Sequence, residues 1–279
     1  MSDVGSEARA VAHRDAMTSA ERAQVTVRGI TGAGQNAEAS ALLARVWGTA
    51  LEAAPLPSDL LVSLSHAGGC VLGAFAADRH LVGTAVCLAG KPCSRSVYSL
   101  IAAVGTEAAG QGVGAALKLA QRAWALDGGA TNMLWTFDPL VRRNAHFNIN
   151  RLGARVSSYA PDFYPPMHDA INQADLTDRL VADWDLTRPA APPDDQPNAV
   201  AVLSCDATGH PVQHEVGDAP RLAVAVPRDI ESVRRTDPDL GRQWRLAVRD
   251  ALQERLAAGH RIVGFLPEGA YVLERGAHD

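Results

Sequence analysis

The stretch AAGQGVGAALKLAQ, from Ala108 to Gln121, places a glycine at every second position and then continues as a run of helix-forming residues. The glycines remove side chains at the start of the predicted helix, where backbone N–H groups and the helix dipole can bind an anion. The stretch therefore predicts either a phosphate-binding loop or a place where a helix and a sheet pack closely. The surrounding elements decide between these two interpretations.

The composition is that of one large or two modest globular domains, with 279 residues of which 47% are hydrophobic and 20% charged. The formal net charge is −5, and no Lys/Arg block stands out, so neither a nucleic-acid nor an anionic membrane surface is expected. The four cysteines form no CxxC pair, and the polar N-terminus MSDVGSEARAVAHRD has no signal-peptide core, which favours a reduced, cytoplasmic setting. No apolar run approaches twenty residues, so no membrane span is expected.

Apolar periodicity outlines a first domain over residues 23–186, preceded by residues 1–22, which lack periodicity and are expected to form a flexible tail or a weak helix. The predicted elements before the glycine stretch are a strand at 24–30, helices at 36–53 and 58–68, and strands at 70–76, 80–89 and 95–104. The turns between the last three strands are too short for crossover helices. These strands should therefore form an antiparallel meander.

Beyond the glycine stretch, the helix is predicted to run to about Asp127. It should be followed by a strand at 131–137, a helix capped by Asp138 and begun by Pro139 that ends near Gly153, and strands at 154–159 and 179–186. Residues 187–199 are rich in proline and acid and are interpreted as a linker. Residues 200–279 are predicted to form a small α/β module with the strands AVAVLSC and RLAVAVP, a helix at 237–259 and a hairpin at 260–275.

Two nucleotide-binding patterns fit the glycine stretch poorly. The Walker pattern requires a lysine at the position that Gln111 occupies. The dinucleotide fingerprint GxGxx[GA] is matched by Gly110, Gly112 and Ala115, but five residues separate Val104 from Gly110, and an antiparallel meander does not precede a Rossmann turn. A Rossmann NAD-dependent oxidoreductase stays open as the third alternative.

The residues from Ala109 to Ala115 resemble the pyrophosphate loop of the GCN5-related N-acetyltransferases (GNAT), [QR]xxGxG[AG], with Ala109 in place of the usual Gln or Arg. The order of predicted elements resembles that fold from about Gln24 to Leu186. WTFDPLVRRNAHFNINRLGA (135–154), with GGCVLGAFA before it and LTDRLVADWDL after it, is similar to a bacterial subgroup of predicted acetyltransferases with a C-terminal extension. The resemblance implies a mixed, twisted α/β sheet flanked by helices.

The resemblance also implies a function, an acyl-CoA-dependent N-acyltransferase that passes an acetyl or other acyl group directly to a small amine such as an amino acid. A non-catalytic acyl-CoA binder is the alternative, because the tyrosine that many relatives use as thiolate donor is replaced by Ile149. No metal, nucleic acid or membrane is expected, and the C-terminal module should cover the acceptor cleft or mediate formation of a homodimer. The residues that would bind the cofactor are Ala103, Val104, Gly110, Gln111, Gly112, Val113, Gly114, Ala115, Asn144, Phe147 and Asn148; the catalytic candidates are Ser99, Asn148 and Tyr159.

Overall fold

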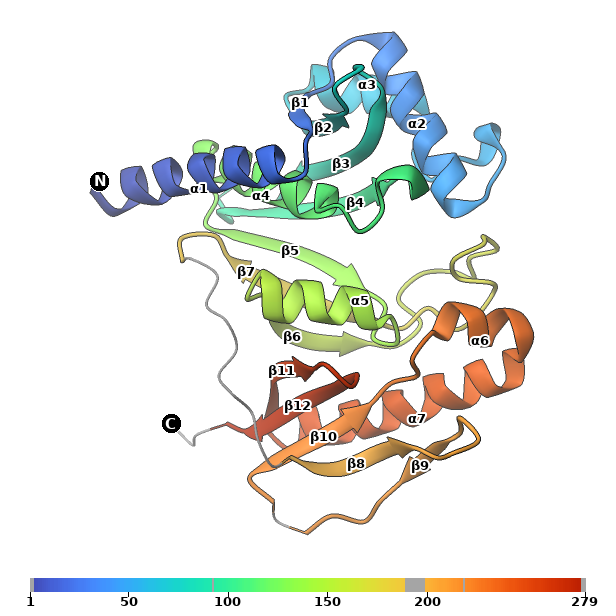
Figure 1. Cartoon of the computed structure of the whole chain (residues 1–279). Helices are drawn as coiled ribbons and strands as arrows, with labels where there is room; N and C mark the ends of the chain where they lie inside the picture. Colours follow the sequence, from blue (N-terminus) through green and yellow to red (C-terminus); the bar gives the residue numbers. More distant parts are fainter. Residues whose placement is uncertain (1–2, 92, 189–198, 218, 277–279) are drawn as a thin grey trace. The chain divides into compact units, whose positions relative to one another are not determined.

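The computed structural model of the chain (Figure 1) describes residues 3–91, 93–188, 199–217 and 219–276. Contacts between Cα atoms divide the chain into two compact units, residues 1–135 with 185–188, and residues 136–184 with 189–279. Most of the predicted linker, residues 189–198, lies outside the described residues. The division falls within a strand of the first predicted domain, so the domain boundaries at 186/187 and 199/200 stay predictions.

Five strands form the sheet of the first unit in the order β1-β2-β3-β4-β5, and β1 to β4 pair antiparallel. This confirms the predicted meander. The fifth strand pairs parallel with β4, because α4 carries the chain back between them. The strands are β1 (Thr26–Gly29), β2 (Cys70–Phe75), β3 (Leu81–Ala89), β4 (Ser96–Val104) and β5 (Asn132–Phe137), the last two residues of which belong to the second unit.

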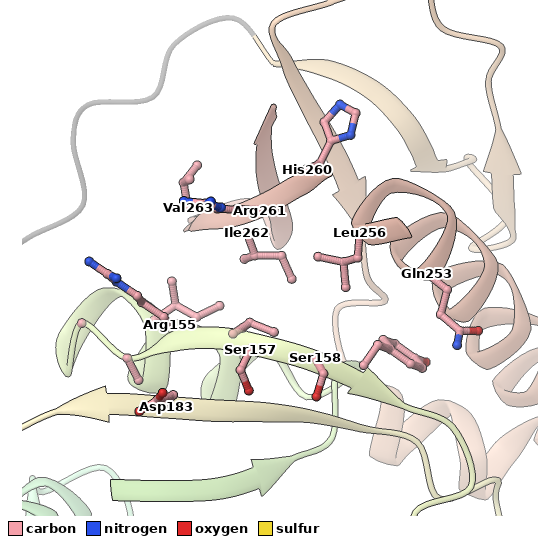
Figure 2. A pocket seen from close by; sticks show the side chains of 15 residues that line it. Arg155, Ser157, Ser158, Asp183, Gln253, Leu256, His260, Arg261, Ile262 and Val263 are labelled. Carbon is pink, nitrogen blue, oxygen red and sulfur yellow. The ribbon is translucent and has the colours of Figure 1, made fainter. Parts of the chain in front are cut away.

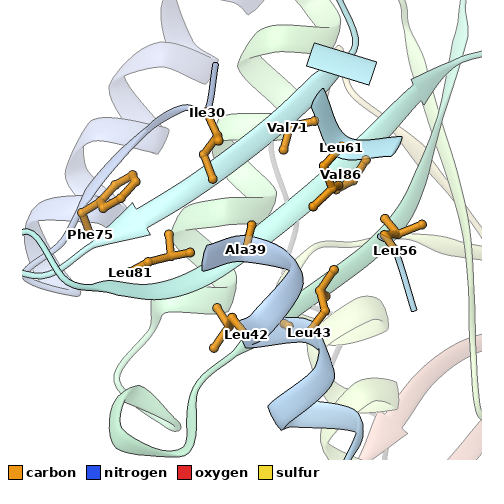
Figure 3. Packing of buried hydrophobic residues seen from close by; sticks show 11 residues of the cluster. Ile30, Ala39, Leu42, Leu43, Leu56, Leu61, Val71, Phe75, Leu81 and Val86 are labelled. Atoms are coloured by element: carbon orange, nitrogen blue, oxygen red, sulfur yellow. The ribbon is translucent and has the colours of Figure 1, made fainter. Parts of the chain in front are cut away.

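Helices α2 (Ala33–Trp47) and α3 (Ser58–His66) cover one face of this sheet. Their apolar residues pack on side chains of β2, β3 and β4 in the core cluster of Figure 3. Helix α2 ends at Trp47, earlier than predicted, because Gly48 takes a left-handed conformation, with φ 65°, that closes its last turn. Ser58 is the first helical residue of α3, as predicted, and Pro57 holds its N-cap position.

Helix α4 (Val113–Asp127) packs on the other face of the sheet, and α1 (Asp3–Arg22) packs against α4. The sequence predicts a loose tail or weak helix for residues 1–22, whereas the structure has a twenty-residue helix there. Its contact stripe contains the small buried residues Ala8 and Ala12, which give little apolar periodicity. Asp15 adds an ion pair with the buried guanidinium of Arg122, 2.9 Å between Oδ2 and Nη1.

In the second unit, β6 (Arg155–Ala160) and β7 (Arg179–Asp185) pair antiparallel, after α5 (Arg142–Ala145) and a π-helical turn (His146–Arg151). The predicted helix start at Asp138 and Pro139 is wrong, because the helix begins at Arg142 with Val141 as its N-cap. The Asp138 carboxylate accepts hydrogen bonds from the Leu140 N–H (2.9 Å) and from Arg234 (2.6 Å) and Arg245 (2.8 and 2.9 Å). These two tertiary ion pairs outweigh the local capping preference.

The C-terminal part of this unit is a five-stranded sheet in the order β11-β12-β10-β8-β9, with the long helix α7 packed on it. The predicted 260–275 hairpin is confirmed as β11 and β12, and Asp237 caps α7 through its carboxylate and Leu240 N–H. The elements are β8 (Val200–Cys205), β9 (Pro211–Gln213), β10 (Arg221–Ala225), α6 (Ile230–Thr236), α7 (Pro238–Ala257), β11 (His260–Leu266) and β12 (Ala270–Arg275).

A buried ionic cluster ties this C-terminal part to the segment around Asp138 within the same unit. Asp175 and Asp138 both accept from Arg234 and Arg245, at 2.6–3.2 Å. Burial alone would raise the pKa of Asp138, but the two guanidiniums outweigh it and hold that pKa well below its ordinary value. The buried Tyr271 hydroxyl donates to the carbonyl of Pro139 at 2.7 Å.

Candidate functional site

The glycine loop connects the end of β4 to the start of α4. A 3-10 turn (Thr106–Ala108) follows Val104, and Gly110 and Gly112 then adopt left-handed conformations, with φ 78° and 89°. Residues other than glycine rarely adopt these values, because their Cβ approaches the following carbonyl oxygen. The two left-handed residues turn the chain sharply, so that it enters the helix at Val113.

Four consecutive N–H groups, those of Gly112, Val113, Gly114 and Ala115, donate to no group that the structure describes. They form the open N-terminus of α4, where a helix lacks internal acceptors and its dipole favours an anion. The N–H of Gln111 instead donates to the Ala108 carbonyl at 3.3 Å, and its side chain donates to the Glu107 carbonyl at 2.9 Å. Gln111 therefore shapes the loop, and the run of consecutive available donors begins at Gly112.

The space around the loop glycines distinguishes anion binding from close packing. A Cβ placed on Gly110 would meet nothing within 4 Å, and one on Gly114 would meet only Val104 Cγ2 at 3.8 Å. Close packing of helix against sheet would have crowded these positions, as it crowds Gly83 of β3, where a Cβ would lie 3.0 Å from side chains of α4. The backbone of Gly110 therefore faces open space, and a Cβ on Gly112 or Gly114 would meet a single side-chain atom at 3.7 or 3.8 Å, which leaves the room that a diphosphate site requires.

Of the two predicted cofactor-binding residues at the end of β4, Ala103 and Val104, one presents a free main-chain donor. Gly105 donates to the Val82 carbonyl at 2.8 Å, so the alternation of an antiparallel ladder places Ala103, opposite Thr84, in the next hydrogen-bonded pair. Val104 lies between these two pairs, and its N–H points away from β3. Val104 is therefore the residue whose N–H can reach a ligand carbonyl on the β5 side of the strand.

β4 leaves β5 near its middle. The two strands pair from Ser96 opposite Asn132 to Tyr98 opposite Leu134. A register shift against β3 leaves Leu100 as an extra residue, which is a β-bulge, a feature often found beside active sites. The bulge reverses the alternation of side chains, so Ala103 joins the α2–α3 core whereas Ser99 faces α4.

The predicted catalytic candidate Ser99 is buried and lies in a polar chain that the sequence interpretation missed. Its hydroxyl accepts from Lys118 Nζ at 2.8 Å and donates to Gln121 Oε1 at 2.9 Å. Lys118 also places Nζ 3.9 Å from the ring centroid of Trp135. The sequence did contain a signal: a lysine, one of only two in the chain, stands at helical spacing among apolar positions of α4 that face the sheet.

The second unit holds the predicted cofactor-binding residues Asn144, Phe147 and Asn148, which lie on α5 and the π-helical turn. Asn144 and Phe147 are half-buried and Asn148 is buried, and within the described chain the amides of both asparagines form no hydrogen bond. Amide groups with free donors and acceptors suit a ligand of mixed polarity. π-helical turns occur frequently at functional sites, and this one replaces the regular helix that the sequence predicts.

Tyr159, another catalytic candidate, is held by its neighbours in the second unit. Its hydroxyl donates to Asp178 Oδ2 at 2.5 Å, and Arg249 donates to both oxygens of the same carboxylate. Burial, followed by the charge of Asp178, raises the pKa of Tyr159 far above its ordinary value. This arrangement suits a structural hydrogen bond better than proton transfer.

A pocket of about 870 Å³ lies within the second unit, between β6, β11 and α7 (Figure 2). Arg155 of β6 and Arg261 of β11 lie at the same end of it, and Ile262 and Leu256 face β6 across it. The volume is in the range that binds small molecules. Of the predicted site residues only Tyr159 lines it, with its hydroxyl already bound to Asp178.

Neither a protein-family model nor a curated protein matches this sequence. Solved structures do resemble part of it. The phosphinothricin acetyltransferase of Sinorhizobium meliloti in complex with AcCoA is 14% identical, with 58% of this chain and 88% of that chain covered and a TM-score of 0.48. An acetyltransferase from Streptococcus pneumoniae is 15% identical, with 57% and 97% covered and a TM-score of 0.47.

Both of these proteins belong to the GNAT family. At such low identity and TM-score, the likeness carries no activity or substrate over to this chain. Within the described residues, no group of three or more His, Cys, Asp or Glu side chains is arranged to hold a metal ion. The helices of that part of the chain include none long and apolar enough to cross a membrane.

Proposed function

We propose that the chain is an acyl-CoA-dependent N-acyltransferase of the GNAT superfamily, which moves an acyl group, in the first place acetyl, from CoA directly to the amine of a small molecule such as an amino acid. One observation carries this proposal. Four free N–H groups, from Gly112 to Ala115, form the open N-terminus of α4, and the glycine loop that leads into it follows a strand that leaves its parallel neighbour. That combination suits a diphosphate followed by an extended arm that lies along the strand.

The roles of the other groups follow from their chemistry. The Val104 N–H would donate to the thioester carbonyl, where negative charge develops during attack by the amine. The amides of Asn144 and Asn148 would serve the amide groups of the pantetheine arm. Direct transfer requires no covalent intermediate with the enzyme.

The alternative is a protein that binds acyl-CoA without turning it over. It is favoured by Ile149, which is buried. This residue stands where many GNAT proteins have the tyrosine that protonates the thiolate. A Rossmann NAD-dependent oxidoreductase is the third candidate, because the loop satisfies the dinucleotide fingerprint letter by letter.

Calorimetric titration of the protein with acetyl-CoA, CoA, succinyl-CoA and NAD separates these functions. We expect binding of the CoA compounds and none of NAD. Gly114→Glu should abolish acetyl-CoA binding without unfolding the protein, because the residue has an ordinary backbone conformation and open space around it. Gly34→Glu in the first turn of α2, also open and without a positive φ, is the matched control and should leave the affinity unchanged.

The acceptor should then be sought by measuring thiol release from acetyl-CoA with L- and D-amino acids, amines and amino sugars. Turnover with one acceptor class supports the transferase. Acetyl-CoA binding without turnover on any acceptor favours the non-catalytic binder, and NAD binding without CoA binding overturns the proposal.

A further inference from the structure

A buried polar cluster lies between α4 and the sheet of the first unit. It contains Ser99 of β4, Lys118 and Gln121 of α4, and Cys87 of β3. Cys87 is the ladder partner of Ser99 and also of Cys70 on β2, so the three side chains form a row across three strands. Apolar residues usually fill the space between a helix and a sheet, so four polar side chains there require an explanation.

Lys118 is the costly member of this cluster. Its side chain is 7% exposed, and none of the described carboxylates lies within ion-pair distance of Nζ. Its neighbours are the Ser99 hydroxyl at 2.8 Å and the face of Trp135 at 3.9 Å. Burial lowers the pKa of Lys118 from 10.5 to about 8. A buried ammonium without a carboxylate partner is characteristic of functional sites.

Gln121 provides a second, independent observation. Its side chain is fully buried, and its Nε2 has no acceptor among the described residues, although its Oε1 accepts from Ser99. Buried amide groups are almost always satisfied in folded proteins. An unsatisfied donor beside an unpaired ammonium indicates that a ligand with acceptor atoms completes the cluster.

The cluster lies where β4 and β5 separate. Pairing ends at Tyr98 and Leu134, and the next residues along the two strands are Ser99 and Trp135, the two groups that Lys118 contacts. Lys118 therefore bridges the two strands at the start of their opening. If the proposed function holds, the acyl-CoA arm enters this opening from the glycine loop on the same helix.

We propose that Lys118 is the general acid of the transfer reaction, and that its ammonium protonates the sulfur of the departing CoA. The inference rests on the proposed function. The amine lone pair forms the C–N bond, the C–S bond breaks, and its electron pair goes to sulfur, which takes a proton from Nζ. The proton lost by the acceptor nitrogen returns to Lys118 through Ser99 or solvent, so the enzyme is regenerated.

Other titratable groups around Lys118 must be distinguished from it. Cys87 faces it from β3, and a hydrogen bond from Cys70, together with the charge of Lys118, lowers the pKa of that thiol against the effect of burial. On α1, Asp15 is paired with Arg122, and His13 with Asp127 at the end of α4. Cys87→Ser therefore serves as the control for thiol titration.

The test needs no known acceptor. Ultraviolet absorbance near 240 nm follows the formation of the thiolate of bound CoA as pH rises. The same titration of the complex with desulfo-CoA, which has no thiol, gives the absorbance of the protein's cysteines, and this is subtracted. In Lys118→Arg, whose cation persists at alkaline pH, the acid dissociation constant of bound CoA should increase about tenfold relative to free CoA. In the wild type the increase should be smaller, because Lys118 itself loses its proton near pH 8. Lys118→Met should abolish this increase, whereas Lys91→Met on an exposed turn and Cys87→Ser should retain it.

With an acceptor from the thiol-release screen, both Lys118→Met and Lys118→Arg should lower kcat roughly 100-fold, since neither side chain is an acid of suitable pKa. Acetyl-CoA affinity should remain, and the alkaline limb of kcat near pH 8 should disappear. If the wild type binds no CoA, the proposed function itself fails. If it binds CoA but the thiol ionises identically in Lys118→Arg and in Lys118→Met, the role of Lys118 is refuted and CoA binding stands.

Discussion

Replacing Lys118 by methionine should stabilise the protein at neutral pH, because the change removes a buried charge and retains most of the side-chain volume. The fall in the pKa of Lys118 from 10.5 to about 8 measures how much folding disfavours the charged form. At ~1.4 kcal/mol per pKa unit, the penalty is about 3 kcal/mol at pH 7. Loss of the hydrogen bond to Ser99 offsets about 1 kcal/mol, leaving a net gain of about 2 kcal/mol.

The pH dependence of this gain has a definite sign. The folded pKa lies below the unfolded one, so between about pH 8 and 10.5 the unfolded chain binds more protons than the folded protein. The free energy of unfolding of the wild type therefore rises with pH through this window, relative to a variant without the amine. The charging penalty of about 3 kcal/mol at pH 7 falls to about 1 kcal/mol at pH 9.5.

Urea denaturation of the wild type, Lys118→Met and Lys91→Met at pH 7 and at pH 9.5 measures this difference. Lys91 is exposed, so its replacement should leave the free energy of unfolding nearly unchanged at both values. The reasoning is refuted if Lys118→Met is less stable than the wild type at pH 7 by an amount that does not change with pH. That result would mean that the ammonium is well satisfied within the folded protein.

Three further changes test other parts of the structure. Asp138→Asn should cost about 3 kcal/mol in urea denaturation, because it breaks buried ion pairs to Arg245 and Arg234, whereas Asp127→Asn at an exposed ion pair should cost well under 1 kcal/mol. Since the folded pKa of Asp138 is depressed, its contribution is present above the ordinary carboxyl pKa of 3.8 and should vanish in strong acid; a pH-independent difference would contradict this. Tyr159→Phe should lower the free energy of unfolding by about 1 kcal/mol and leave kcat unchanged. A large fall in kcat would show that Tyr159 has a catalytic role. Gly112→Ala should cost about 1 kcal/mol in thermal unfolding, because the φ of Gly112 is 89°. It should also weaken acetyl-CoA binding, and an unchanged affinity would contradict the assignment of the loop as the diphosphate site.

The features that the sequence predicts well depend on residues close together in the chain. The three short-turned strands could only pair as a meander, and Gly110 and Gly112 take the left-handed conformations that the loop needs. Patterns of small residues were less informative. Helix α1 packs through alanines, which have too little apolar surface to produce a recognisable period.

The features that the sequence does not reveal depend on distant residues. Asp138 followed by Pro139 has the pattern of a helix start, but its carboxylate binds arginines 96 and 107 residues further along. The Lys118 cluster likewise requires β3, β4 and α4 together, and it depends on a one-residue bulge at Leu100 that turns Ser99 toward the helix. A register shift of that kind follows from tertiary packing and has no local sequence signature here.

The proposed function requires that the N–H groups from Gly112 to Ala115 bind the diphosphate of an acyl-CoA. Titration of the 15N-labelled protein with acetyl-CoA, followed by amide NMR, tests it directly, since hydrogen bonds to a charged oxygen move amide protons strongly. We expect large downfield shifts at these four amides, and none upon addition of S-acetylpantetheine, which lacks the diphosphate. Binding of acetyl-CoA that leaves the four resonances in place, or no binding at all, would contradict it.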